Sequence, residues 1–197
     1  MMKFFGGLLV CGVLMALFGV VGMQNTLVSL DSAPISSWNQ IEGHYRNRYA
    51  LVKKLVPAAE DAPGVDNLAI AGVIMAFEEA AQAEVTNDTL HDYAALKEYE
   101  EKQVRLWKAL KVFFKSIDSI TDPKKKAFIK DIGLQLDETA DGGAAERWEY
   151  NRAVKRFNEA IEKPALIPLV KYSNFRKRVR SDGPVVDPDA APASSGL

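Results

Sequence analysis

The stretch that decides the fold is RWEYNRAVKRFNEAI, residues 147–161. Its large apolar residues recur at intervals of three or four, which is the period of a helix with one buried face. These residues are Tyr150, Val154, Phe157 and Ile161. The sequence therefore predicts an amphipathic helix, whose buried face must pack against other helices.

Two asparagines on this helix need a separate explanation. Asn151 and Asn158 each follow an aromatic residue and lie seven residues apart, so they share one stripe beside the apolar face. Asparagine is a mediocre helix former, because its amide competes for backbone hydrogen bonds. We predict that both amides bind a neighbouring helix and fix its register. Two solvated surface asparagines are the alternative.

The same apolar period appears in three earlier stretches, so the fold class is all-α. Helices are expected from about Trp38 to Pro57, from 66 to 84 and from 90 to 121, and the last helix extends over 124–162. Gly142 and Gly143 lie inside this last helix, where they either break it or allow close packing. No stretch alternates as a strand does. We expect an elongated, antiparallel four-helix bundle with coiled-coil character.

The amino terminus indicates a membrane segment. Residues 4–23 are uncharged and mostly apolar, and twenty helical residues span a hydrocarbon core of about 30 Å. A cleaved signal peptide is the alternative, although its apolar region is usually shorter. Gly12, Ala16 and Gly19 share one helix face and are candidates for packing between membrane helices.

Basic residues near the segment predict its orientation. Lys3 precedes it, and no lysine or arginine follows until Arg46, so the amino terminus is expected in the cytoplasm. The body then lies on the extracytoplasmic, periplasmic side of a bacterial inner membrane, as a single-pass protein. The expected organisation is an anchor at 1–24, a linker at 25–35, a helical bundle at 36–180 and a disordered tail at 181–197.

A basic cluster precedes this tail, although the whole chain has a net charge of only −1. Its candidate interaction residues are Arg176, Lys177, Arg178 and Arg180. In an extracytoplasmic body the expected partners are membrane lipids or an acidic protein, and not nucleic acid. A solvated end of the bundle is the alternative.

The sequence contains no pattern of residues that predicts catalysis. Cys11 is the single cysteine, and His44 and His91 are the only histidines. A haem or metal site that uses both histidines is the weaker alternative, and we expect no cofactor and no metal. Adjacent carboxylates such as Glu78 and Glu79 diverge around a helix, so they do not converge on one substrate. We expect a protein that is not an enzyme.

Two motifs resemble the LemA family. Arg147, Tyr150, Asn151, Asn158 and Pro164 lie in a run similar to the family's R..YN..V..YN..I...P helix. The first predicted helix resembles the family's W..I...Y.RR segment, through Trp38, Ile41, Tyr45, Arg46 and Arg48.

The resemblance covers about residues 4–180, with proline displaced to Pro57 and with unfamiliar middle helices, as in a divergent member. It implies a membrane-anchored, elongated four-helix bundle without an assigned reaction.

These observations lead to two expectations about function. The first is a scaffold or self-associating protein at the membrane, with a homo-oligomer or a membrane protein as partner. The second is an accessory or adaptor subunit of another membrane complex, such as a protease or a transporter. Arg46 and Arg48 are expected to pair with Glu146 or Glu149 on the last helix, as a structural contact.

Overall fold

The computed structural model describes residues 2–139 and 143–182, and for residues 2–17 it describes the backbone alone. These parts of the chain contain helices and no strand. The α-helices are α1 (Met2–Glu60), α2 (Asn67–Ala81), α3 (Tyr93–Lys115), α4 (Pro123–Glu138), α5 (Ala144–Ile161) and α6 (Ile167–Tyr172). Short 3-10 helices are η1 (Thr89–His91), η2 (Ile117–Ser119) and η3 (Pro164–Leu166).

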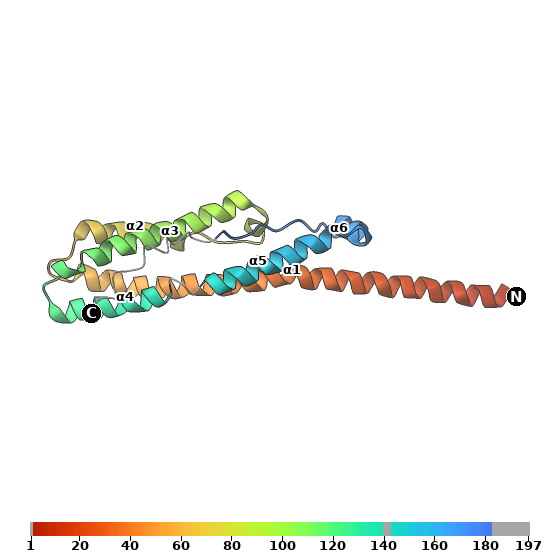
Figure 1. Ribbon diagram of the computed structural model, residues 1–197, viewed down its shortest axis with the longest axis horizontal. Helices are drawn as coiled ribbons and strands as arrows, with labels where there is room; N and C mark the ends of the chain where they lie inside the picture. Colours follow the sequence, from red (N-terminus) through yellow and green to blue (C-terminus); the bar gives the residue numbers. More distant parts are fainter. Residues whose placement is uncertain (1, 140–142, 183–197) are drawn as a thin grey trace.

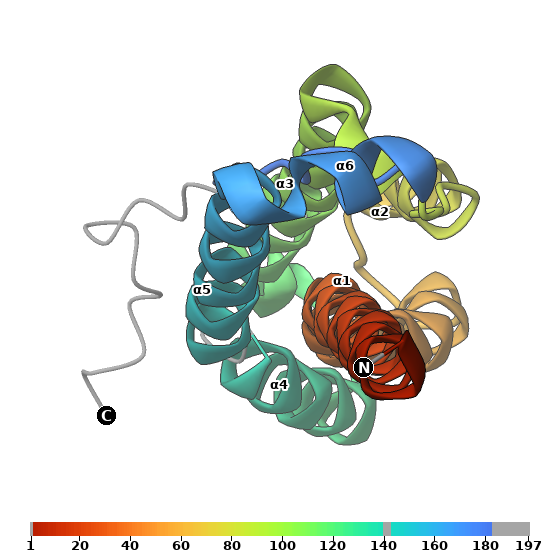
Figure 2. The ribbon, with the colours of Figure 1, turned by 90° about the vertical axis from the view of Figure 1, so that its right-hand side faces the viewer.

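The helices form an elongated bundle around α1 (Figure 1). α2 and α3 pack as a pair on one side of α1, while α4 and α5 follow one another along it. Figure 2, which looks along the long axis, shows these helices around α1, with α6 across the end of the body nearest the amino terminus. The all-α prediction is confirmed. The four long helices expected from the sequence are not what the chain forms.

The predicted fourth helix, 124–162, is two helices. α4 ends at Glu138, where the Thr139 hydroxyl donates a hydrogen bond to the carbonyl of Leu136. α5 begins after Gly143, and a Cβ at Gly143 would lie 2.6 Å from the Arg147 guanidinium. Gly143 therefore leaves room for the side chain that begins the decisive stretch. Gly142 lies outside the described residues.

Three other helix starts are set by aspartates. Asp66, Asp92 and Asp122 each accept hydrogen bonds from two backbone N–H groups in the first turn of α2, α3 and α4. The predicted third helix, 90–121, is shorter, because residues 89–91 form η1 and Asp92 caps α3. Thr86 and Thr89 bind each other at 3.1 Å, which holds the turn before η1 and starts the helix later than predicted.

One feature of α1 contradicts the predicted linker. Residues 25–35 are helical and belong to α1, which includes Pro34 and Pro57. Tertiary contacts explain why this polar stretch stays helical. Leu27 is fully buried against Phe157, Ala160 and Ile161 of α5. Because α5 covers residues 27–30, α1 enters the bundle without a break.

The core lies along the inner faces of the helices as three clusters of buried side chains, and aromatic rings are prominent in the cluster around Trp38. Trp38 of α1 packs edge-on against Tyr150 of α5, with ring centroids 5.3 Å apart, and against Tyr99 of α3 at 6.0 Å. The predicted apolar face of α5 is confirmed, since Tyr150, Val154 and Phe157 are fully buried. Trp38 and Tyr150 therefore join α1, α3 and α5 at the centre of the body.

The predicted membrane segment lies mostly outside the residues with described side chains. In the part that the structure does describe, no helix is both long and apolar enough to cross a membrane. Gly12 and Ala16 fall among the residues known by backbone alone. Gly19 is exposed, and a Cβ there would have no neighbour within 4 Å.

Candidate functional site

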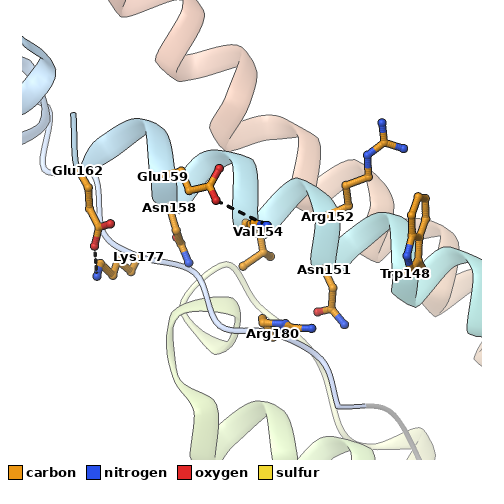
Figure 3. Close-up of a pocket in the computed structure, with 10 residues that line it drawn as sticks. Trp148, Asn151, Arg152, Val154, Asn158, Glu159, Glu162, Lys177 and Arg180 are labelled. Carbon is orange, nitrogen blue, oxygen red and sulfur yellow. Dashed lines mark ion pairs between the residues drawn. The ribbon is translucent and has the colours of Figure 1, made fainter.

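After α6 the chain turns back along α5 as an extended segment, residues 176–182, which we call the strap. Figure 3 shows it running beside α5, with Asn151 and Asn158 pointing toward it. The turn before it is shaped by Asn174, which has a φ of 53° and so adopts the left-handed conformation that asparagine tolerates. The two asparagines of residues 147–161 therefore have the strap as their partner.

The two asparagines bind the strap through its backbone. Asn158 donates from Nδ2 to the Arg178 carbonyl at 2.8 Å, and its Oδ1 accepts from the Arg178 N–H at 2.9 Å. Asn151 makes the same pair with Ser181, at 2.7 and 2.9 Å. An amide offers one donor and one acceptor side by side, so each asparagine replaces a residue of a neighbouring strand.

The spacing of the two pairs follows from the geometry of helices and strands. Seven residues of α5 rise about 10 Å along the helix axis. Three residues of extended chain, from Arg178 to Ser181, also cover about 10 Å. The prediction that both amides form hydrogen bonds across the structure is confirmed. The predicted partner was wrong, because the amides bind an extended segment and not a neighbouring helix.

The other edge of the strap is also bound through its backbone. The Tyr150 hydroxyl donates to the carbonyl of Val179 at 2.8 Å, and the Val179 N–H donates to the carbonyl of Leu90 in η1 at 2.9 Å. Burial raises the pKa of the Tyr150 hydroxyl, which therefore keeps its proton. The strap thus joins α5 to η1.

Arg178 is the buried anchor of the strap. Its guanidinium contacts Asp31 of α1 at 2.8 Å through Nη2, and Nε donates to the same carboxylate at 2.9 Å. Nη2 also donates to the Asn87 side chain at 3.0 Å, and the guanidinium lies 5.8 Å from the centre of the Phe157 ring. One side chain therefore connects α1, the loop before η1, α5 and the strap.

Ser181 is the second buried residue of the strap. Its hydroxyl donates a hydrogen bond to the Glu100 carboxylate on α3, and both residues are buried. The predicted disordered tail began at residue 181, but Ser181 and Asp182 belong to the strap. Residues 183–197 lie outside the described residues.

The other candidates in the basic cluster have different environments. Arg176 pairs with Asp88 at 2.7 Å, and Lys177 pairs with Glu162. Arg180 is exposed, beside Asn151 (Figure 3). Arg178 is 2% exposed and lies in the interior, so the residues of the predicted cluster do not form one basic surface.

The arginines of α1 do not pair as predicted. Arg46 is exposed and contacts Glu42 at 3.8 Å. Arg48 is buried, donates to the Thr139 carbonyl at 3.3 Å and lies 5.1 Å from the centre of the Trp107 ring. The predicted pairing with Glu146 or Glu149 was wrong because of position along α1. His44, and not Arg46 or Arg48, lies beside the first turn of α5.

Glu146 and Glu149 have other partners. His44 contacts Glu146 at 3.2 Å, and Arg152 contacts Glu149 at 3.7 Å. A backbone hydrogen bond, followed by the contact with His44, holds the pKa of Glu146 below its usual range. His91 instead pairs through Nδ1 with the Lys177 carbonyl at 2.8 Å. Among the described residues, no three histidine, cysteine or acidic side chains gather as a metal site would require.

A groove of about 600 Å³ lies along the outer side of α5 and the strap (Figure 3). Its walls combine an exposed aromatic ring, both strap-binding asparagines and charged side chains of both signs. The lining residues are Trp148, Asn151, Arg152, Val154, Lys155, Asn158, Glu159, Glu162, Lys177 and Arg180. Two ion pairs, Lys155 with Glu159 and Lys177 with Glu162, lie among the exposed side chains of the groove.

The sequence contained a signal for one partner that was not interpreted. Asp31 is the only charged residue between residues 4 and 41. A single carboxylate in a long uncharged stretch indicates a specific cation partner, which is Arg178. Asn87 offered no such signal, because its role depends on how the loop before η1 folds.

Comparison with known proteins places these features in a wider group. The model of the LemA family matches residues 37–179, from within α1 to the strap. No curated protein matches the chain significantly. The match includes Trp38, the decisive stretch of α5 and Arg178.

Proposed function

We propose that this chain, which belongs to the LemA family, is a non-catalytic, single-pass helical bundle that scaffolds or self-associates at a bacterial membrane. Its body would lie on the extracytoplasmic side of the inner membrane. The proposal rests on the continuity of α1, the composition of residues 4–23 and the surface of α2.

The continuity of α1 is the observation that carries the proposal. α1 runs from Met2 to Glu60 without a break, so the uncharged residues 4–23 and the core residue Trp38 belong to one helix. A segment of this length and composition has the properties of a membrane anchor. Direct attachment to the core would give the body a fixed position relative to the lipid.

Self-association is supported by the outer face of α2. Leu68 is 85% exposed and Met75 is 66% exposed, and they lie two turns apart on one face. Between them, a Cβ at Gly72 would have no neighbour within 4 Å. A helix that is apolar on both faces usually has a partner on each. α2 lies along α1 (Figure 1), so a second copy anchored in the same membrane would present its α2 parallel to the first. Contact at Gly72 would then place the two Leu68 side chains side by side, and the two Met75 side chains likewise.

The experiment is a mass measurement on the full-length protein after mild extraction from its own membrane, together with identification of co-purified proteins. We expect a defined homo-oligomer that Leu68→Glu converts to monomer. Leu134→Glu is the matched control, because Leu134 is a similarly apolar residue on α4, 59% exposed. A wild-type protein that is monomeric and free of partners would contradict the proposal.

The alternative function, an accessory or adaptor subunit, is favoured by the groove beside the strap. An exposed tryptophan and an exposed arginine, Trp148 and Arg180, line it, and both residue types are common in protein interfaces. A monomer that carries one stoichiometric partner would support this function. Loss of that partner on Trp148→Ala, with retention on Phe128→Ala, would assign the interaction to the groove, because Phe128 is an exposed aromatic residue on α4.

A further inference from the structure

We propose that the η3–α6 end of the body is a membrane-contact surface, made by Lys163, Ile167, Lys171 and Tyr172, which lies on anionic lipid head groups. We call these four residues the α6 surface. This inference rests on the proposed anchoring through residues 4–23 and adds to it a second, non-inserted contact with the same bilayer.

The position of the α6 surface follows from its packing against the cluster that joins α1 to α5. Leu169 and Val170 of α6 pack around the cluster that contains Leu27. Figure 1 shows α6 at the end of the body from which the amino-terminal part of α1 projects. Leu27 lies four residues beyond Met23, so α6 is about 6 Å along the axis from the end of the apolar segment. Head groups occupy this level of a bilayer.

The rigidity of α1 fixes this level. Residues 23–31 are helical, and Leu27 and Asp31 are both tied to the body, by burial and by the ion pair with Arg178 at 2.8 Å. A flexible linker would let the body move away from the lipid. A helix restricts this movement to tilting, so the α6 surface stays near the head groups when residues 4–23 are inserted. Its lysines can then shift the tilt toward contact with the lipid.

The composition of the surface suits an interface between lipid and water. Tyr172 is 89% exposed and Ile167 is 41% exposed, whereas Leu169 and Val170 of the same helix are partly buried. Tyrosine is enriched at the head-group level, where its ring contacts apolar groups and its hydroxyl stays hydrated. Lysine behaves similarly, because its methylene groups contact the apolar region while its ammonium group stays in water.

The charge of the surface indicates an anionic partner. No acidic residue occurs between residues 163 and 180. Three carboxylates that contact the chain after α6 are already paired: Glu162 with Lys177, Asp88 with Arg176 and Asp31 with Arg178. Within the part of the chain that the structure describes, Lys163 and Lys171 form no ion pair. These two lysines therefore remain to attract lipid phosphates.

The test measures depth in the bilayer. In a Cys11→Ser background, single cysteines at Tyr172, Leu68 and Val20 carry an environment-sensitive fluorophore, and the full-length protein is reconstituted into vesicles. The vesicles contain phosphatidylcholine, with or without phosphatidylglycerol, and a lipid spin-labelled on its head group quenches nearby fluorophores. Leu68 lies at the far end of the body, on α2, and reports the unquenched value.

We expect quenching at positions 172 and 20 and none at position 68, with stronger quenching at 172 when phosphatidylglycerol is present. Lys163→Gln and Lys171→Gln should each lower the ratio of docked to undocked protein about fivefold in these vesicles, because a basic residue near an anionic surface contributes about 1 kcal/mol. Quenching at 20 without quenching at 172 would overturn the α6 surface and leave the anchor intact. No quenching at either position would overturn both.

Discussion

At the scale of single residues, the amides of Asn151 and Asn158 make the strap part of the fold. Each amide binds one N–H and one carbonyl of the strap backbone. Among the described residues the strap has no neighbouring strand that could bind these groups instead. The strap is therefore held through its backbone as well as through the side chains of Arg176, Lys177, Arg178 and Ser181. Such binding tolerates changes at Val179 and Arg180 but not a change in length.

We predict that Asn158→Ala lowers the free energy of unfolding by about 1–3 kcal/mol. The substitution removes two hydrogen bonds and leaves the backbone of Arg178 partly buried without partners. Asn47→Ala is the control, because Asn47 is an exposed asparagine in the middle of α1. Urea unfolding of both variants provides the comparison. Equal stability of the two variants would show that the amide pairs contribute nothing.

Removing the hydroxyl groups of two buried tyrosines should change the free energy of unfolding in opposite directions. The Tyr45 hydroxyl is buried and has no hydrogen-bond partner among the described residues, whereas the Tyr150 hydroxyl binds the Val179 carbonyl. Tyr45→Phe removes an unsatisfied polar group and should leave the protein as stable or about 1 kcal/mol more stable at neutral pH. Tyr150→Phe should destabilise it by about 1 kcal/mol. Urea unfolding at pH 7 distinguishes them.

Tyr45 also predicts a dependence on alkaline pH. Burial raises the pKa of Tyr45 to about 12, from 10.0. In the unfolded chain the hydroxyl loses its proton near pH 10, while the folded protein retains it. The unfolded state then binds fewer protons, so stability falls as the pH rises from 10 to 12. We expect Tyr45→Phe to reduce this slope, measured by unfolding at successive pH values between 9 and 11. An unchanged slope would show that Tyr45 does not contribute.

At the scale of elements, the sequence predicted which segments are helical better than it predicted where they end. The apolar periods of α2 and α5 were sufficient, because each has a single buried face. The start of α3 is set by the Asp92 cap, after the pairing of Thr86 with Thr89 holds the turn before η1. Tertiary burial of Leu27 likewise keeps residues 25–35 helical against their composition.

The strap could not be predicted for a related reason. The amides of Asn151 and Asn158 were recognisable as unusual in a helix, but their partner lies 20 to 30 residues away in a segment without periodicity. Its extended form is imposed by α5, η1 and Asp31 together. The basic residues of the segment suggested a surface, although Arg178 is in the interior.

Two glycines in helices test the packing between elements. A Cβ at Gly133 of α4 would lie 2.8 Å from the Phe114 ring of α3, whereas one at Gly43 of α1 would meet nothing within 4 Å. We predict that Gly43→Ala stabilises the protein by up to about 1 kcal/mol through helix propensity. Gly133→Ala should destabilise it by about 1 kcal/mol net, because steric displacement of the ring outweighs that gain. Thermal unfolding of both variants should shift in opposite directions, and a shared upward shift would contradict the close contact.

At the scale of the whole molecule, Arg178 holds together parts that no other described side chain connects in this way. Arg178→Ala should destabilise the protein by about 3–5 kcal/mol, because it removes one partner of a buried ion pair and leaves Asp31 uncompensated. Arg176→Ala removes an exposed pair with Asp88 and should cost at most about 1 kcal/mol. Urea unfolding followed by circular dichroism measures both. Similar losses for the two variants would mean that burial of Arg178 has no energetic weight.

The unbroken course of α1 has a consequence for how copies of the protein would face one another. Each residue of a helix turns the chain by about 100° and advances it about 1.5 Å. One residue inserted between Met23 and Leu27 would leave the distance of the body from the bilayer almost unchanged. It would, however, rotate the body, including α2 and the groove, by about 100° around the membrane normal. The number of residues between Met23 and Leu27 therefore determines which side of the body faces a neighbouring copy in the membrane.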